Sequence, residues 1–558
     1  MQDLYKNIQH DNNFDIDICK MFVSSYVFKI LVLSWITITL NKSRIERLVE
    51  TDLKRYLSSI RRGIEKESLR TDRNGFIAES AHPSELGSPL THKNITTDFS
   101  EALIELVTDC HESPSEVMQQ LKDLHKITYA SIQNELLWPN SMPCMLPKES
   151  KIKIGNYGSS NIGMMKQIYR RGLSNRYGSY MQTISGIHYN FSLPDIFFSE
   201  LQKTESRTLD LQSFKSDCYF GLIRNFHRFS WFLLYFLGAS PVVSKNFLKS
   251  ENHRLIPMRE NTDSFFTPNA TSLRMGDLGY KSQAQDSLEI RYDSIETYIS
   301  DLRSALALKY SDYEKIGVRG IDGEYKQLNT NLLQIENEFY STIRPKRTTE
   351  LGEAPTQALE NRGVEYVEIR CIDVNPFLPC GIDENTVHLL DIFLTYCLLS
   401  TSPPINDDEK QEIPSNYLKT VYDGRDPNLM LSVSGKDVNL RDLAKTPIND
   451  MTPVAECLDI ANKKTVYSSA LLTCEQRLEN DSLLPAAKII SKIRDTGKSF
   501  QEITLKSAQD YSEHFAAMPM DQDLIGHYSN AALESIKKQN TLEQSDTLSF
   551  EEFVKLFP

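Results

Sequence analysis

Residues 63–70 read GIEKESLR and residues 364–371 read VEYVEIRC, and these two stretches decide the fold. Both alternate apolar with polar side chains, and successive side chains of a β-strand point to opposite faces of a sheet. Glu65 and Glu67 would therefore project from one face of the first strand, and Glu368 from one face of the second. This alternation is typical of an antiparallel sheet with one polar, working face.

Two further stretches carry the same pattern. Residues 185–192, SGIHYNFS, place His188 on a polar face, and residues 333–340, LQIENEFY, place Glu336 and Glu338 on another. The strand-like stretches do not alternate regularly with helices, which disfavours a doubly wound parallel sheet. We predict an α+β fold whose mainly antiparallel sheet is flanked by helices.

The sequence also indicates how the chain is divided. A helical spacing of apolar residues runs from Ile45 to Ile60, and strand-like and helical patterns then alternate to about residue 400. Residues 402–416, SPPINDDEKQEIPSN, are rich in Pro and charge and predict a loop or boundary. We therefore expect an extension at 1–38, a catalytic region at 39–400 and a mostly helical region at 401–558.

Composition excludes several classes of protein. The chain has 558 residues with 62 Lys and Arg against 75 Asp and Glu, a net charge of −13. An acidic balance disfavours nonspecific nucleic-acid binding, which needs basic side chains to displace counterions. The nine cysteines include no CxxC pair, so neither a zinc knuckle nor a disulfide framework is expected. Free thiols indicate a reducing compartment, and we expect a cytoplasmic protein.

Residues 21–40 read MFVSSYVFKILVLSWITITL, an apolar stretch interrupted by Lys29. Its length just reaches across a bilayer, but a central Lys costs about 3 kcal/mol on insertion. The acidic residues ahead of it do not fit a secretory signal, which needs a basic start. The alternatives are a membrane anchor, a buried helix or strand, and a translated upstream stretch without function. The anchor is the least favoured of these.

The polar faces indicate a metal site. Many carboxylates with one imidazole suit Mg²⁺, or Mn²⁺, better than a metal that prefers thiolates. The alternative is a solvated outer face, but such a face tolerates Lys, Thr and Ser, whereas these strands repeatedly offer Glu. An isolated Glu-x-Glu pair would not support the metal interpretation, because surface ion networks give the same pattern.

A nucleotide site would have to be built without the common phosphate-binding loops. The sequence contains neither a Walker A motif nor a GxGxxG that opens a helix. The cationic candidates are Arg370, Arg344, Lys346 and Arg347, although each could instead be surface charge. Tyr and Arg also interleave at 166–182 and 271–280, as in a small pocket with a carboxylate clamp.

Longer blocks of sequence are more specific than any of these motifs. They read RGIEKESLR (62–70), LGSPLTHKNITTDFSEALIELVT (86–108), WPNSMPC (138–144), YGSSNIG (157–163), RYGSYMQTISGIHYNFSLP (176–194), LGASPVV (237–243), ATSLRMGDLGY (270–280), LQIENEFYSTIRPKR (333–347) and GVEYVEIRCIDVNPFLPCGID (363–383). In this order they resemble the glutamate–cysteine ligase family, in its proteobacterial type, from about residue 39 to residue 538.

The resemblance implies a fold and a reaction. The family has a sheet related to that of glutamine synthetase, curved into a funnel whose inner face binds Mg²⁺ and ATP. ATP phosphorylates the γ-carboxylate of glutamate, and the cysteine amine then attacks the γ-glutamyl phosphate. The products are γ-glutamylcysteine, ADP and phosphate, in the first step of glutathione biosynthesis. We expect the chain to be a monomer rather than an obligate oligomer.

The resemblance also assigns roles to residues. The positions that match metal ligands are Glu65, Glu67, Glu105, His188 and Glu368. Arg370 matches a phosphate-contacting position, and with Glu65 and Glu368 it forms the expected catalytic set; Arg344 and Lys346 are expected beside it at the nucleotide. The positions that match the amino-acid pocket are Tyr169, Arg170, Arg274, Tyr280 and Tyr340.

Two alternatives to this function stay open at the level of sequence. A related Mg-ATP ligase could use a different amine acceptor, and competition with cysteine and 2-aminobutyrate would distinguish it. A noncatalytic nucleotide-binding protein would have lost Glu65 or Glu368, and both residues are present.

Deleting residues 1–38 should leave active enzyme, because the family pattern begins at about residue 39 and does not need the apolar stretch. Fractionation of cells and an activity assay on the truncated chain check this expectation. Misfolding of the truncated chain, or sedimentation of the full-length chain with membranes, would contradict it.

Overall fold

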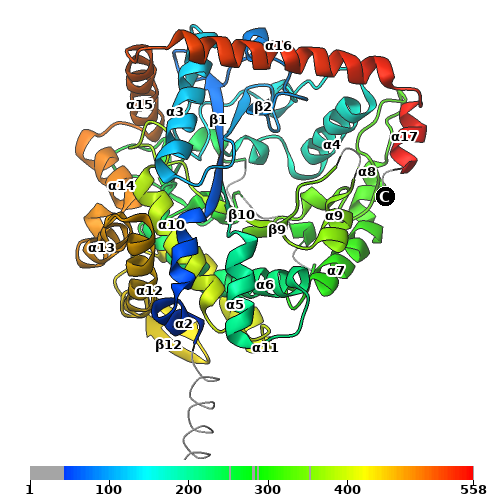
Figure 1. Ribbon diagram of the computed structural model, residues 1–558. Coiled ribbons are helices and arrows are strands. Elements are labelled where there is room, and N and C mark those ends of the chain that lie inside the picture. Colours follow the sequence, from blue (N-terminus) through cyan, green and yellow to red (C-terminus); the bar gives the residue numbers. More distant parts are fainter. Residues whose placement is uncertain (1–42, 250–252, 280–282, 286–287, 351–352, 557–558) are drawn as a thin grey trace, which may run out of the picture.

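The computed structural model describes residues 43–249, 253–279, 283–285, 288–350 and 353–556. The expectations for residues 1–38 and for Tyr280 therefore lie outside the described residues. Figure 1 shows the arrangement of the chain, with the central strands surrounded by helices. No helix among the described ranges is both long and apolar enough to cross a membrane.

The main sheet is antiparallel throughout and has the order β2-β3-β1-β5-β10-β9, with β4 paired to β1. Its strands are β1 Arg61–Thr71, β2 Ile95–Thr97, β3 Leu103–Val107, β4 Leu136–Leu137, β5 Ile187–Ser192, β9 Ile343–Lys346 and β10 Tyr366–Ile372. Smaller sheets comprise β6 Val242–Ser244, β7 Ile256–Pro257 and β8 Ser264–Phe266, and β11 Met430–Val433 and β12 Lys436–Asn439. The predicted α+β fold is confirmed, as are the strands at 63–70, 185–192 and 364–371.

Helices supply the rest of the regular structure. They are α2 Arg44–Glu50, α3 Pro114–Ser131, α4 Asn161–Tyr177, α5 Asp195–Glu205, α6 Leu211–Leu237, α7 Ile295–Ala307, α8 Ser311–Ile316, α9 Pro355–Arg362, α10 Glu384–Leu399, α11 Asp407–Asp423, α12 Leu440–Asn462, α13 Val466–Glu479, α14 Pro485–Thr496, α15 Phe500–Ala516, α16 Gln522–Ser545 and α17 Phe550–Leu556. The helical character predicted for the C-terminal part is therefore present, although a β-hairpin precedes α12.

The strand predicted at 333–340 is wrong. The segment is a loop with one 3-10 turn at Glu336–Glu338. The Glu338 carboxylate accepts a hydrogen bond from the Gln334 backbone N–H, and Glu336 accepts two from Thr356 at the start of α9. Such side-chain bonds to nearby backbone groups compete with a strand ladder.

The loop predicted at 402–416 is also partly wrong, because α11 begins at Asp407 and continues through Pro414. Asn406 and Glu409 form a capping box at its start, which satisfies backbone groups that a helix terminus leaves unpaired. This local signal outweighs the Pro and charge that indicated a boundary.

The apolar face of the sheet is buried against helices. Tyr189, Val367 and Ile369 on that face are fully buried, and α6 and α10 pack close by. A buried ion pair joins Arg62 of β1 to Asp391 of α10 at 3.0 Å, and the Tyr189 hydroxyl donates to the same carboxylate. Apolar burial and this polar network together fix which face of the sheet points away from the core.

The C-terminal strap is formed by α16, residues 546–549 and α17. It runs across the top of the molecule in the view of Figure 1. Gly87 and Gly158 lie directly beneath α16 with positive φ, so side chains there would collide with it. The Asp546 carboxylate accepts a hydrogen bond from the Asn161 backbone N–H at the first turn of α4. The strap therefore holds the N-terminal end of α4, where a negative charge is also favoured by the helix dipole.

Replacing Gly87 with Ala should lower the free energy of unfolding by about 3 kcal/mol, because left-handed strain adds to overpacking. The new Cβ would lie 2.8 Å from the Ala532 Cα and would also contact the Ser535 hydroxyl. Urea unfolding measures the change.

Gly317→Ala is the matched control. Gly317 has φ 75° and ψ 162° against φ 79° and ψ −158° at Gly87, but the nearest atom to its Cβ position is the Arg319 carbonyl oxygen at 3.6 Å, an ordinary contact. It should carry only the backbone strain, about 1 kcal/mol. Equal losses in the two variants would show that contact with α16 does not matter.

Candidate functional site

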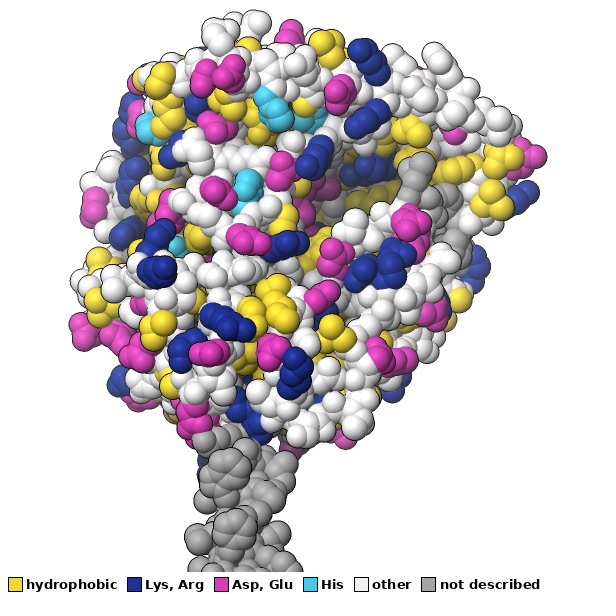
Figure 2. Space-filling model, viewed as in Figure 1, with side chains coloured by type: hydrophobic (Ala, Val, Ile, Leu, Met, Phe, Trp, Pro, Cys, Tyr) yellow, Lys and Arg dark blue, Asp and Glu magenta, His cyan; other side chains and the backbone are white. Residues whose placement is uncertain are grey.

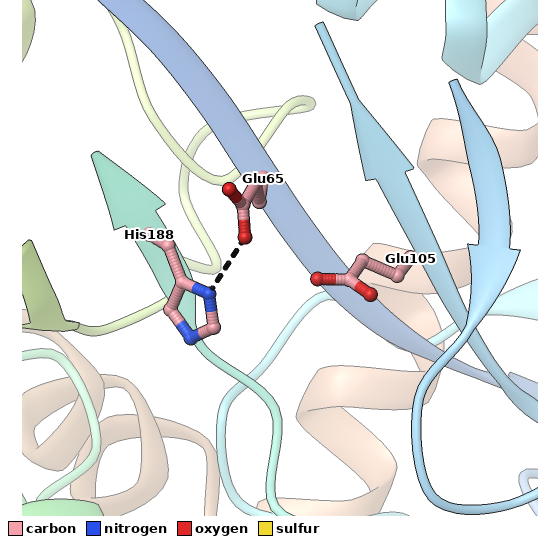
Figure 3. Close-up of side chains that lie close together, drawn as sticks. All are labelled: Glu65, Glu105 and His188. Atoms are coloured by element: carbon pink, nitrogen blue, oxygen red, sulfur yellow. Dashed lines mark hydrogen bonds and ion pairs between the residues drawn. The ribbon is translucent and has the colours of Figure 1, made fainter. Parts of the chain in front are cut away.

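Register across the antiparallel strands brings the acidic side chains together. Glu65 of β1 lies opposite His188 of β5, and Glu67 lies opposite Glu105 of β3. Figure 3 shows Glu65, Glu105 and His188 converging from three strands, and one potential ligand atom from each lies within 4.8 Å of the others. Facing pairs in a sheet are close enough for their charges to interact strongly.

His188 occupies the centre of this cluster. Its Nδ1 lies 3.1 Å from the Glu65 carboxylate and 3.5 Å from that of Glu368, and its Nε2 lies 3.9 Å from Glu67. Asn190, two residues along the same strand, donates a hydrogen bond of 2.9 Å to Glu65. The sequence-predicted metal positions therefore form one connected cluster.

Electrostatics divide the carboxylates into two groups. Burial raises the pKa of Glu67, and burial together with the negative charge of Glu65 raises the pKa of Glu105 well above its usual value. Burial also opposes ionisation of Glu368, but Lys346 and Arg370 hold its pKa well below its usual range. A raised pKa means that the protein supplies too little positive charge or hydrogen bonding to stabilise the ionised carboxylate.

Cations border the cluster on the β9–β10 side. Glu368 pairs in register with Arg344, and Tyr366 with Lys346. The Lys346 ammonium lies 3.1 Å from the Glu368 carboxylate, and the Arg370 guanidinium donates to that carboxylate at 2.8 Å. The β10 register shifts between Ile369 and Ile372, and a bulge of this kind commonly re-aims a side chain beside a functional site.

Arg274 approaches from outside the sheet. It is 2% exposed and donates a hydrogen bond of 2.7 Å to the Arg370 carbonyl. Its guanidinium lies 3.8 Å from Asp373, whose carboxylate also accepts bonds from Ser240 and Ser272. These contacts fix the position of a cation that also borders the cavity.

The second wall of the site comes from α4 and the loop at 333–340. Lys166, Tyr169 and Arg170 project from one face of α4, and Tyr340 contributes from the loop. The Arg170 guanidinium stacks 4.5 Å from the Tyr157 ring centroid and bonds to the Asp98 carbonyl. Sheet and helix together enclose a cavity of about 450 Å³, and Figure 2 shows the hollow on this face, with basic, acidic and apolar side chains inside it.

Twelve sequence-predicted site residues line this cavity: Glu65, Glu67, Glu105, Tyr169, Arg170, His188, Arg274, Tyr340, Arg344, Lys346, Glu368 and Arg370. Arg347 does not line it, because its side chain lies 3.8 Å from Glu365 and donates to the Arg362 carbonyl. Their individual roles stay predictions. Arg344 also donates to the Asn337 carbonyl, so part of its guanidinium shapes the loop rather than facing a ligand.

Other lining residues were not assigned from the sequence. They are Asp98, Lys166, Gln182 and Glu338, among others. Glu338 forms a fully buried pair with Arg176 at 2.7 Å and accepts a bond from the Tyr177 hydroxyl, which ties the loop to α4. The spacing of Lys166, Tyr169, Arg170 and Leu173 on one helical face was the signal that could have found Lys166.

Fold and site together define the class of protein: an α+β protein whose sheet presents a cluster of carboxylates and cations to a cavity on one face. Comparison with known proteins narrows this class. The family model for glutamate–cysteine ligase matches residues 45–420. A glutamate–cysteine ligase of Alcanivorax borkumensis is 43% identical over 517 residues, which cover 92% of this chain and 98% of that protein.

A second relative and a solved structure indicate the same family. The glutamate–cysteine ligase of Pseudomonas putida KT2440 is 43% identical over 492 residues, covering 88% of this chain and 93% of that protein. The crystal structure of the Francisella tularensis enzyme, solved in complex with AMP, matches with a TM-score of 0.84 and 35% identity, covering 89% of this chain and 97% of that one. The chain therefore belongs to the glutamate–cysteine ligase family, and the ligase activity predicted from its motifs is confirmed.

Glu105→Gln should stabilise the chelator-treated protein at pH 7.5, because it removes a carboxylate whose pKa is raised in the folded state by burial and by the charge of Glu65. The gain should vanish as the pH falls below about 4.3, where the unfolded chain also holds the proton. Thermal unfolding in EDTA measures both effects.

Glu368→Gln is the matched control and should do the opposite. A carboxylate with a depressed pKa stabilises the fold above its unfolded pKa and loses this contribution as the pH falls through its folded pKa. Stability changes of the same sign in both variants at pH 7.5 would contradict the division of the cluster.

Proposed function

We propose that the cavity joins the γ-carboxylate of glutamate to the amine of cysteine, with ATP as co-substrate, as the first step of glutathione biosynthesis. The observation that carries the proposal is the continuity of the cavity: one wall presents carboxylates and cations for a metal–phosphate group, and the other presents Tyr and Arg for amino acids. The reaction needs both groups of side chains within reach of one another, because the phosphorylated carboxylate must meet the amine.

The donor set fits a hard divalent cation. Glu65, Glu67, Glu105, His188 and Glu368 supply mostly carboxylate oxygen, which Mg²⁺ prefers and Mn²⁺ accepts. No described residue donates a hydrogen bond to the Glu105 carboxylate, and the buried Oε2 of Glu368 has a nearby ammonium but no hydrogen bond. A cation between these groups would offset their repulsion. When bound, it would neutralise charge on the transferred phosphate.

In this proposal Lys346 and Arg370 contact the nucleotide, with Arg344 beside them. In phosphoryl transfer the protein mainly positions the groups and stabilises their charge, so cations suffice and no protein nucleophile is needed. The pairs that Lys346 and Arg370 form with Glu368 hold both cations at the border of the cluster. The AMP complex of the Francisella tularensis relative supports a nucleotide in this fold.

The amino acids would occupy the wall built by Tyr169, Arg170, Arg274 and Tyr340, with Tyr280 expected beside them. Arg274 offers a guanidinium that its contacts with Asp373 and the Arg370 carbonyl hold in place. A fixed, planar cation binds a carboxylate with two parallel bonds, which orients the substrate as well as binding it.

A reducing compartment agrees with this chemistry. The eight cysteines that lie in the described ranges are all free thiols, and seven of them are buried. We propose that the enzyme works in the cytoplasm, where such thiols stay reduced and where the cysteine substrate also keeps its thiol.

An omission assay tests the proposed function. Purified full-length chain should release phosphate from ATP and form γ-glutamylcysteine only when glutamate, cysteine and Mg²⁺ are all present. Mass spectrometry identifies the product. An equal rate with an unrelated amine in place of cysteine would favour a ligase that uses a different amine acceptor. The absence of turnover under every condition would contradict the proposal.

The variant Glu65→Gln ties the activity to the cluster. It should lower kcat at least a hundredfold at saturating Mg²⁺, because ligands of one site act as a unit. Glu296→Gln, a change at an exposed position on α7 that is not part of the cavity lining, should leave kcat unchanged. Near-normal turnover in Glu65→Gln would exclude it from the metal site.

A further inference from the structure

Lys166 stands out among the cations that line the cavity. It lies on α4, one turn before Arg170, and both side chains contact the face of Tyr157: its ammonium lies 5.2 Å from the ring centroid. It is half-buried, and burial followed by repulsion from Arg170 lowers its pKa to about 8, although attraction to the Glu105 and Asp98 carboxylates opposes this shift. A cation withdrawn from water in this way is unfavourable unless an anion compensates it.

The other described cations of the cavity wall all have an anionic or carbonyl partner. Lys346 and Arg370 contact Glu368, and Arg274 contacts Asp373. Arg170 bonds to the Asp98 carbonyl and Arg344 to the Asn337 carbonyl. Among the residues that the structure describes, none forms an ion pair or a hydrogen bond with the Lys166 ammonium. Its aromatic contact with Tyr157 does not supply a negative charge.

The position of Lys166 limits which anion it can meet. Its neighbours on the cavity side of α4 are Met165, Tyr169 and Leu173, which form the apolar and aromatic wall. The cations that border the carboxylate cluster on the β9–β10 side belong to different elements. A phosphate bound beside Lys346 and Arg370 already has two cations near it. On the α4 wall, Arg170 bonds to a carbonyl, whereas the Lys166 ammonium forms no ion pair or hydrogen bond with a described residue.

We propose that the Lys166 ammonium binds the α-carboxylate of one of the two amino-acid substrates. The inference rests on the proposed ligase function and adds a residue to it. The γ-carboxylate of glutamate must stay available for phosphorylation, so an α-carboxylate is the group that a fixed lysine can hold throughout the reaction. Lys166 would then contribute to substrate specificity. An analogue of glutamate or cysteine that lacks the α-carboxylate leaves the ammonium without a counter-charge and should bind more weakly.

The test compares the parent enzyme with Lys166→Met, which keeps an unbranched apolar side chain and removes the charge. The KM for glutamate or for cysteine should rise at least tenfold, while the KM for ATP changes less than twofold. Lys151→Met, at an exposed lysine of the 3-10 turn that precedes α4, is the control and should change none of the three. Thermal unfolding should show little loss of stability in Lys166→Met, because the ammonium forms no ion pair or hydrogen bond with a described residue and the Met side chain keeps an apolar contact with Tyr157.

Decarboxylated analogues identify the carboxylate. Cysteamine replaces cysteine, and γ-aminobutyrate replaces glutamate, each lacking only the α-carboxylate. The parent should use one of these at least tenfold less efficiently, and Lys166→Met should lose that discrimination, since the ammonium and the carboxylate form one pair. If Lys166 only neutralises Asp98 and Glu105, Lys166→Met should lower the Mg²⁺ concentration needed for turnover, because the carboxylates lose a competing positive charge. It should also leave the discrimination intact, and that result would overturn the proposal.

The outcomes separate this inference from the proposed function. A parent enzyme without glutamate- and cysteine-dependent turnover contradicts the function itself. An active parent whose KM values and analogue discrimination match those of Lys166→Met contradicts only the role of Lys166. If Lys166→Met does not fold, Lys166→Gln provides the same comparison with a polar side chain of similar length.

Discussion

Repulsion among carboxylates on one face of the sheet is the constraint on which the rest of the structure depends. Glu67 and Glu105 face each other across two strands, with Glu65 and Glu368 close by, and like charges in facing positions weaken strand pairing. The strands keep this register because their opposite faces are buried. A slip by one residue would turn every carboxylate into the core.

The positive groups are placed where they limit that repulsion without abolishing it. His188 lies between three carboxylates, and Lys346 and Arg370 compensate Glu368. Glu105 keeps a strongly raised pKa, so part of the cluster is left under-compensated. Uncompensated charge of this kind is common at functional sites, where a bound ligand supplies the opposite charge that the protein lacks.

The second wall of the cavity has separate support, part of which comes from residues beyond 420, where the family-model match ends. Asp546 holds the start of α4, and Phe550 of α17 joins a small apolar cluster that includes Ile168 and Leu328. Tyr169 packs against that cluster and also lines the cavity. The buried Glu338–Arg176 pair connects the same helix to the loop before β9. The strap and the buried pair therefore position the α4 wall independently of the sheet.

The sequence by itself determined the strands of the working face and the chemical type of the site, because a period of two is a local property of the chain. It misread 333–340 and 402–416, where a side-chain bond and a capping box overrode pattern and composition. Only the tertiary structure decided that α4, Arg274 and the Glu338 loop meet the sheet at one cavity, and that the Lys166 ammonium there forms no ion pair or hydrogen bond with a described residue. These facts depend on contacts between residues far apart in sequence, and alternation along one strand carries no information about them.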